Sequence, residues 1–61
     1  MFEGLEVNDK VFLDDGKNPY EGYIVAIDEE TITLNIFVPD IDVTFKKSEI
    51  AEITKLKKIT T

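Results

Sequence analysis

Between Thr31 and Val38 the chain alternates apolar side chains with mostly polar ones. One set consists of Ile32, Leu34, Ile36 and Val38, and the set between them consists of Thr31, Thr33, Asn35 and Phe37. A period of two is what a β-strand with one buried face requires, because successive side chains point to opposite faces of a sheet. Similar short runs flank this one from Val11 to Ile53, each ended by a turn signal. The pattern therefore predicts one small, strongly bent antiparallel sheet.

Turn-forming residues separate the runs and set the expected strand limits. Strands are predicted over Lys10–Asp14, Tyr20–Asp28, Thr31–Val38 and about 41–46. The segment Asp14–Pro19 is dense in turn formers and predicts a long excursion in place of a tight hairpin. Gly22 inside the second run predicts a bulge, a sharp bend or the close approach of another backbone. Because both faces of that run are apolar, we expect a central strand or one that changes sides at a bulge.

The C-terminal part of the chain allows two interpretations. Residues Ser48–Ile53 are typical of a single turn, and Ser48 is the expected N-cap. A 3₁₀ turn followed by a final strand over about 51–57 fits the apolar positions better than a C-terminal helix does. In a helix, Ile50, Ile53, Leu56 and Ile59 would drift around half the circumference and form no clean apolar face. Both interpretations of residues 50–58 stay open at this point.

Length and composition narrow the class of protein. Sixty-one residues correspond to one domain, 1–61, with a small core. The chain has no cysteine and no histidine, which removes disulfides and the common zinc ligand sets. We see no signal-peptide pattern at the N-terminus and no apolar run of the length that a membrane span needs. We therefore expect a cytoplasmic protein that uses no cofactor and holds no metal.

Charge is distributed unevenly along the sequence. Residues 1–45 hold eleven carboxylates and two lysines, a balance of −9, whereas residues 46–61 hold two carboxylates and five lysines, a balance of +3. These balances give the overall net charge of −6. Most of the surface should therefore repel phosphate backbones. The absence of arginine also argues against sequence-specific readout of nucleic acid.

Four segments together resemble the SH3-like small barrels, a group that includes the Sm-like and KOW-type domains. They are the entry Leu5–Val11, the polar loop Asp14–Pro19, the glycine-containing run Tyr20–Asp28, and Val43–Phe45 followed by Ser48–Ile53. The resemblance covers about residues 5–58 and is architectural. It implies an all-β fold: a five-stranded, strongly bent antiparallel SH3-like barrel with a short 3₁₀ turn before the last strand. Barrels of this group serve many functions, so the resemblance does not select one.

Enzymatic chemistry is not expected from these residues. Without His or Cys, a nucleophile such as Ser48 would need a carboxylate or lysine base in a cleft that a chain this short rarely provides. The segment Asp14–Asn18 offers oxygen ligands but lacks the spacing and the distal Glu of a calcium loop. We interpret its acids as partners of local backbone donors.

Aromatic residues near the polar loop indicate a binding surface. We nominate Phe12, Tyr20, Tyr23 and Phe37 as aromatic anchors and Asp14 and Asp15 as an acidic rim. Interfaces are enriched in aromatic residues, and carboxylates steer a basic surface toward them. The leading hypothesis is therefore a non-enzymatic module that binds another protein, one with a basic surface.

Other functions remain as alternative hypotheses. The acidic balance also suits a small phage- or plasmid-type inhibitor that occupies the basic groove of a nucleic-acid-handling enzyme. A Sm-like or KOW-like nucleic-acid binder would use a basic strip formed by Lys55, Lys57 and Lys58, although lysines on a last strand also discourage edge-to-edge aggregation. The thin stability of so short a chain would favour a homo-oligomer closed by edge-strand pairing.

Overall fold

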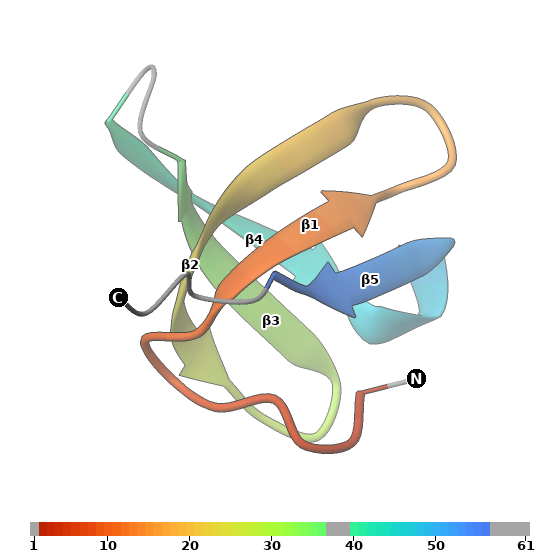
Figure 1. Cartoon of the computed structure of the whole chain (residues 1–61). Coiled ribbons are helices and arrows are strands. Elements are labelled where there is room, and N and C mark those ends of the chain that lie inside the picture. Colours follow the sequence, from red (N-terminus) through yellow and green to blue (C-terminus); the bar gives the residue numbers. More distant parts are fainter. Residues whose placement is uncertain (1, 37–39, 57–61) are drawn as a thin grey trace.

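The computed structural model describes residues 2–36 and 40–56, and it is all-β in these ranges (Figure 1). The elements are β1 (Lys10–Asp14), β2 (Pro19–Ile27), β3 (Thr31–Ile36), β4 (Ile41–Lys46), the 3₁₀ turn η1 (Lys47–Glu49) and β5 (Glu52–Lys55). The strands follow the sequence prediction closely. The predicted extension of the third strand to residues 37 and 38 lies outside the described residues.

The five strands form one antiparallel sheet in the order β4-β3-β2-β1-β5. Strands β1 to β4 follow one another as a meander, and β5 returns to pair with β1, so that Leu13 lies opposite Ile53. The sheet bends so strongly that the β3–β4 hairpin crosses behind β1 (Figure 1). The predicted five-stranded antiparallel sheet is confirmed. It is not closed in the described residues, because β4 and β5 remain its two edges.

The segment after β4 corrects one detail of the sequence prediction. The 3₁₀ turn η1 begins at Lys47, its N-cap position is Lys46, and no side chain caps it, so the assignment of Ser48 as N-cap is wrong. The reason is that β4 pairing continues to the turn: the Lys47 N–H donates to the Glu30 carbonyl at 2.8 Å. The predicted 3₁₀ turn before a final strand is confirmed. A helix over residues 52–55 is wrong, because these residues pair with β1.

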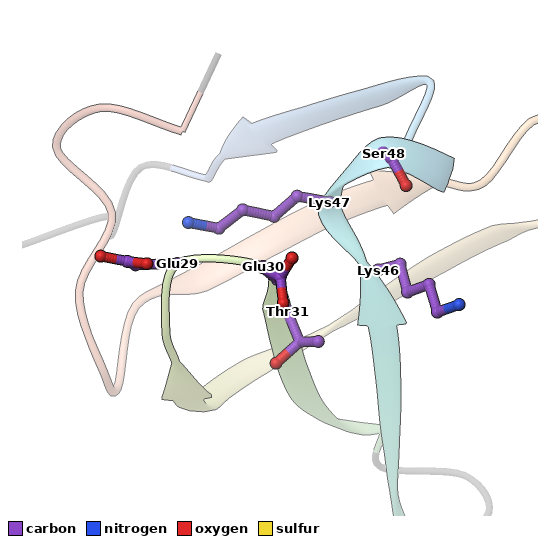
Figure 2. A pocket seen from close by; sticks show the side chains of 6 residues that line it. All are labelled: Glu29, Glu30, Thr31, Lys46, Lys47 and Ser48. Atoms are coloured by element: carbon purple, nitrogen blue, oxygen red, sulfur yellow. The ribbon is translucent and has the colours of Figure 1, made fainter.

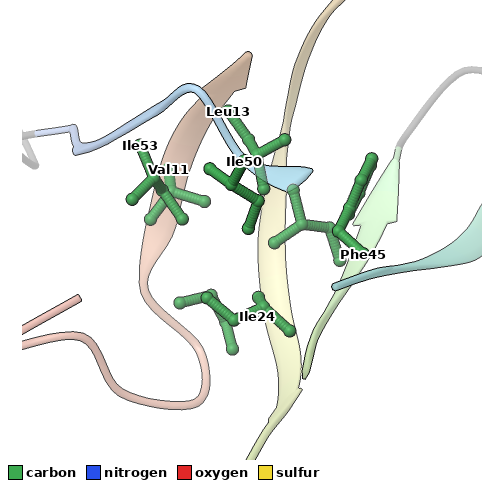
Figure 3. Close-up of a cluster of buried hydrophobic side chains, with 8 residues drawn as sticks. Val11, Leu13, Ile24, Phe45, Ile50 and Ile53 are labelled. Atoms are coloured by element: carbon green, nitrogen blue, oxygen red, sulfur yellow. The ribbon is translucent and has the colours of Figure 1, made fainter. Parts of the chain in front are cut away.

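The core lies on the inner, concave face of the sheet (Figure 3). Strands β1 to β4 each contribute alternate residues to it, and the segment after η1 closes it from one side. Burying one such side chain contributes about 1.5–3 kcal/mol, so most of the stability of a small domain resides here. The buried residues are Val11, Leu13, Ile24, Ile32, Leu34, Phe45, Ile50 and Ile53.

Strand β2 is central and also changes sides, as its two apolar faces predict. The register shifts between Ile24, which lies opposite Leu34, and Ala26, which lies opposite Thr33. The residue between them, Val25, is 42% exposed. The bulge therefore lies at Val25, whereas Gly22, three residues earlier, marks the other predicted feature, a close backbone approach. A Cβ at Gly22 would overlap the carbonyl oxygen of Asn35 on β3.

The residues before β1 cover one end of the core. Phe2 and Leu5 pack against the buried cluster. The segment is tied to β2, because the Asn8 N–H donates to the Ile24 carbonyl at 2.7 Å and the Ile24 N–H donates to the Asp9 carbonyl at 2.9 Å. Asn8 has φ of 80° at this junction, a left-handed conformation that asparagine tolerates better than most residues. The N-terminal segment is thus part of the folded unit.

Candidate protein-binding surface

Two of the nominated aromatic residues lie together on the outer, convex face of the sheet. On β1, Val11 and Leu13 are completely buried, so Phe12 between them points to the opposite face, where it is half-buried. Phe12 lies opposite Glu21 on β2, and Tyr23, two residues further along β2, lies opposite Lys10. Phe12 and Tyr23 are therefore diagonal neighbours on one face, a spacing that aromatic side chains can bridge.

An ion pair lies on the other diagonal of the same four residues. The Nζ of Lys10 is 3.3 Å from Oε2 of Glu21, and both side chains are partly exposed. An exposed pair of this kind contributes about 0.2–1 kcal/mol, so its main effect is to fix where the two charges lie. Glu21 thus presents its carboxylate beside Phe12.

Two carboxylates face each other at the other end of β1. Asp14, two residues after Phe12 on the same face, lies opposite Glu52 on β5. Like charges directly opposite each other across strands destabilise a sheet. The sheet therefore presents Phe12 and Tyr23 with three carboxylates around them on the outer face of β5, β1 and β2. We call the set Phe12, Tyr23, Asp14, Glu21 and Glu52 the outer patch.

The carboxylates of the β1–β2 loop accept hydrogen bonds from local backbone N–H groups, as the sequence predicts. The Gly16 N–H donates to Oδ1 of Asp14, and the N–H groups of Lys17 and Asn18 donate to Oδ1 of Asp15, each at 2.8 Å. The N–H groups of Asn18 and then Lys17 hold the pKa of the Asp15 carboxyl below its usual value. Asp15 therefore stays ionised at neutral pH, and the hydrogen bonds that both acids accept stabilise the loop.

Tyr20 does not join the outer patch. It has the same parity along β2 as Ile24, so it faces the concave side and packs on Phe45 with ring centroids 5.0 Å apart. These two rings line a shallow hollow between β4 and the β1–β2 loop, together with Asp15, Lys17, Val43, Thr44 and Glu49. The structure thus divides the nominated surface: Phe12, Tyr23 and Asp14 lie on the convex face, whereas Tyr20 and Asp15 border the hollow.

Of the remaining nominated residues, the structure describes only Lys55. Phe37, Lys57 and Lys58 lie outside the described residues. Lys55, the described member of the predicted basic strip, has its Nζ 3.3 Å from Oδ2 of Asp9. Its charge is therefore balanced locally by the N-terminal segment.

A second hollow lies where the β2–β3 turn meets the end of β4 (Figure 2). Glu29, Glu30 and Thr31 line it from one side, and Lys46, Lys47 and Ser48 line it from the other. Figure 2 shows that the two lysines point in opposite directions, with Lys46 directed away from Glu29. The Nζ of Lys47 lies 5.3 Å from the centre of the Phe2 ring, a cation–π contact.

The turn that borders this second hollow has its own acidic anchor. Oδ1 of Asp28 accepts hydrogen bonds from the N–H groups of Thr31 at 2.8 Å and Glu30 at 2.9 Å, and the Thr31 hydroxyl also donates to it. These donors, the Thr31 N–H first, lower the pKa of the Asp28 carboxyl. Asp28 therefore stabilises the β2–β3 turn as an ionised group.

Within residues 2–36 and 40–56, no three His, Cys, Asp or Glu side chains are grouped in a way that could hold a metal ion. In the same ranges there is no helix of the length and apolar character needed to cross a membrane. The carboxylates of Asp14, Asp15 and Asp28 accept hydrogen bonds from backbone N–H groups of their own turns. The outer patch combines two aromatic rings with negative charge.

Sequence reasoning missed two members of the outer patch, Glu21 and Glu52. Each lies near Phe12 only because of strand pairing, Glu21 through β2 and Glu52 through β5. The sequence separation of Glu52 from Phe12 hides this proximity. A correct register for the β1–β5 pair is the signal that would have found it.

Comparisons with known proteins leave the chain without an assigned family: no protein-family model matches it, and neither a curated protein nor a solved structure does.

Proposed function

We propose that this chain is a non-enzymatic protein-binding module with the architecture of an SH3-like small barrel. The architecture is supported by the wide β1–β2 loop, the bent β2 with Gly22, and the 3₁₀ turn between β4 and β5. These are features on which the resemblance to SH3-like barrels rests. Since such a fold serves many functions, the binding function rests on the outer patch alone.

The observation that carries the proposal is the position of Phe12. A half-buried aromatic ring occupies the convex face of the sheet, with Tyr23 on its diagonal and the carboxylates of Asp14, Glu21 and Glu52 around it. An aromatic anchor surrounded by polar groups is the usual centre of a protein interface. The carboxylates of Asp14 and Glu52 would steer a basic surface and orient it on the rings, whereas Glu21 is paired with Lys10. The partner is therefore a protein with an apolar pocket bordered by lysine or arginine.

The acidic charge favours a second candidate, an inhibitor that occupies the basic groove of a nucleic-acid-handling enzyme. Its binding would rely on the exposed acids of the β2–β3 turn, Asp28, Glu29 and Glu30, together with Asp14 and Asp15. Such an interface would lose affinity steeply as salt rises, because exposed charges are screened. Nucleic-acid binding by the lysine strip is not favoured, since Lys55 is paired with Asp9.

Affinity capture with patch variants tests the proposal. Tagged wild-type protein, Phe12→Thr and Tyr23→Thr are incubated with nuclease-treated lysate at about 50 and about 300 mM salt, which changes the screening length severalfold. Ala26→Ser is the matched control, because Ala26 is exposed on the same face of β2 but outside the outer patch. Threonine keeps the strand propensity, and circular dichroism verifies folding.

We expect a protein that is captured at both salt concentrations by the wild type and the control, and is lost with either aromatic variant. Equal capture by Phe12→Thr and the wild type would refute binding through the outer patch. Capture at low salt only, insensitive to both aromatic substitutions but lost when the β2–β3 turn acids are neutralised, would replace it with the inhibitor function.

A further inference from the structure

The two edges of the sheet differ in how well they resist pairing with another strand. Strand β5 is only four residues long, begins with Glu52 and ends with Lys55, whose ammonium is paired with Asp9. Strand β4 is six residues long and pairs with β3 in unbroken register from Ile41 to Lys46. It contains no proline, no bulge and no lysine before its last residue. Short length, charge and bulges are what normally protect an edge; β4 carries charge at Asp42 and Lys46, as β5 does at Glu52 and Lys55, but β4 is longer, so it is the more accessible edge for pairing.

The hydrogen-bonding groups on the open side of β4 follow from its pairing with β3. The Lys47 N–H donates to the Glu30 carbonyl. Along an antiparallel edge strand, residues whose backbone groups bond to the neighbouring strand alternate with residues whose backbone groups point away from it. The backbone groups of Asp42, Thr44 and Lys46 therefore point to the open edge. Among the described residues no strand pairs with this side of β4, and its middle residues Val43, Thr44 and Phe45 line a hollow together with Asp15, Lys17 and Glu49.

We infer that two copies of this chain pair through β4, antiparallel, about a two-fold axis at Thr44. This arrangement places Asp42 of each copy opposite Lys46 of the other on the convex face. On the concave face it places Val43 opposite Phe45 of the second copy. A two-fold interface must be self-complementary, and β4 satisfies this in both charge and apolar character. This inference is independent of the proposed function, since no residue of the outer patch lies on β4.

Other registers satisfy fewer groups. A shift by one residue would place the apolar side chains of one copy beside the polar side chains of the other. A two-fold axis at Val43 would place Asp42 opposite Thr44, and Lys46 opposite Asp40, which precedes the strand. The axis at Thr44 pairs all three residues of β4 whose backbone groups point to the open edge. Figure 2 shows the Lys46 side chain directed away from Glu29.

Charge reversal tests both the dimer and its register. Asp42→Lys would place two lysines opposite each other at each end of the interface, and Lys46→Asp would place two aspartates there. We expect each single variant to associate roughly tenfold or more weakly than the wild type, because two attractive cross-strand pairs become repulsive. An equimolar mixture of the two variants should recover the dimer, since every opposing pair is then again of opposite sign.

Sedimentation equilibrium over a range of protein concentrations measures the result against the 7.0 kDa mass of one chain. Glu6→Lys is the matched control, because it makes the same charge change as Asp42→Lys on an exposed residue outside the sheet. Recovery on mixing also excludes misfolding, since each variant must be folded to pair with the other.

Three results would overturn the inference. The wild type could remain monomeric at the highest concentration, or it could assemble beyond a dimer. Alternatively, a wild-type dimer could persist in both single variants as strongly as in the Glu6→Lys control, which would rule out the register at Thr44. A dimer weakened by each substitution and restored by mixing supports the pairing.

Discussion

Gly22 is the position where the smallest substitution should have the largest effect on the fold. It lies in β2 opposite Ile36 and is buried in the sheet. In Gly22→Ala the new Cβ would overlap the Asn35 carbonyl oxygen and lie 3.0 Å from the Asn35 carbonyl carbon and 3.5 Å from the Ile36 Cα. All three atoms belong to the backbone of β3. Because none of them can rotate away as a side chain would, β2 and β3 must separate locally.

The expected cost follows from two opposing contributions. Inserting a methyl group into a packed site that cannot yield costs about 1–3 kcal/mol. Removing a glycine also restricts the unfolded chain, which stabilises the folded state by about 0.4–1 kcal/mol. With rigid backbone in the way, the net loss should be about 2 kcal/mol. At 61 residues the whole domain has a free energy of unfolding of roughly 3–9 kcal/mol, so this loss is a large fraction of it.

Urea denaturation followed by far-UV circular dichroism measures the difference, and a thermal scan should show a decrease in Tm of roughly 8–16 °C. Gly16→Ala is the control, because no atom lies within 4 Å of its Cβ position and its φ of +90° is the only obstacle. That substitution should cost about 1 kcal/mol through backbone strain. If Gly22→Ala were as stable as the wild type, or less destabilising than Gly16→Ala, the close approach of β2 and β3 would not be the reason for this glycine.

Three further predictions concern pH, packing and charge. The folded-state pKa values of Asp15 and Asp28 lie below the ordinary 3.8, so the stability that these groups contribute is complete above that pH and is lost as pH falls through the folded values. Urea-denaturation midpoints measured from pH 2 to 7 should therefore fall less steeply at acid pH in Asp15→Asn and Asp28→Asn than in the wild type. Leu34→Ala removes a completely buried side chain and should lower the free energy of unfolding by about 2–5 kcal/mol, whereas a smaller loss in urea titration would mean that the core can collapse around the cavity. Glu52→Lys replaces the repulsion of Asp14 by attraction and should raise that free energy by up to about 1 kcal/mol, and a decrease would show that the two carboxylates do not face each other.

The strands of this protein are predictable from sequence because one face of each must be buried. Ile32 and Leu34 alternate with Thr31 and Thr33, and the structure buries the first pair completely. The start of η1 was missed because β4 pairing extends to Lys47, a tertiary effect that overrides the capping preference of Ser48. The position of the bulge at Val25 was also hidden, since an extra residue in an apolar strand leaves no compositional mark.

The outer patch was harder to predict than the sheet. Phe12 is assigned to the convex face by its neighbours Val11 and Leu13, which are plainly core residues. Tyr20 and Tyr23 lie on either side of Gly22 in a strand with two apolar faces, so the sequence does not show which of them faces the core. Tyr20 lies an even number of residues from the core residue Ile24 and shares its face, whereas Tyr23 lies on the opposite face. The nearest carboxylates are supplied by strand register, which alternation within one strand does not determine.

The return of β5 to β1 has a consequence for the order in which the chain assembles. Val11 and Lys55 are direct partners although 44 positions separate them, whereas only a few residues separate β2 from β3 and β3 from β4 along the chain. Closing the long loop costs about 2 kcal/mol more in chain entropy than closing a four-residue hairpin loop. During synthesis, the β2–β3–β4 meander can therefore form while β1 still lacks its last neighbour. The concave side of β1 is covered only once Ile50 and Ile53 have emerged from the ribosome, so the final few residues of the sheet complete the core of the first strand.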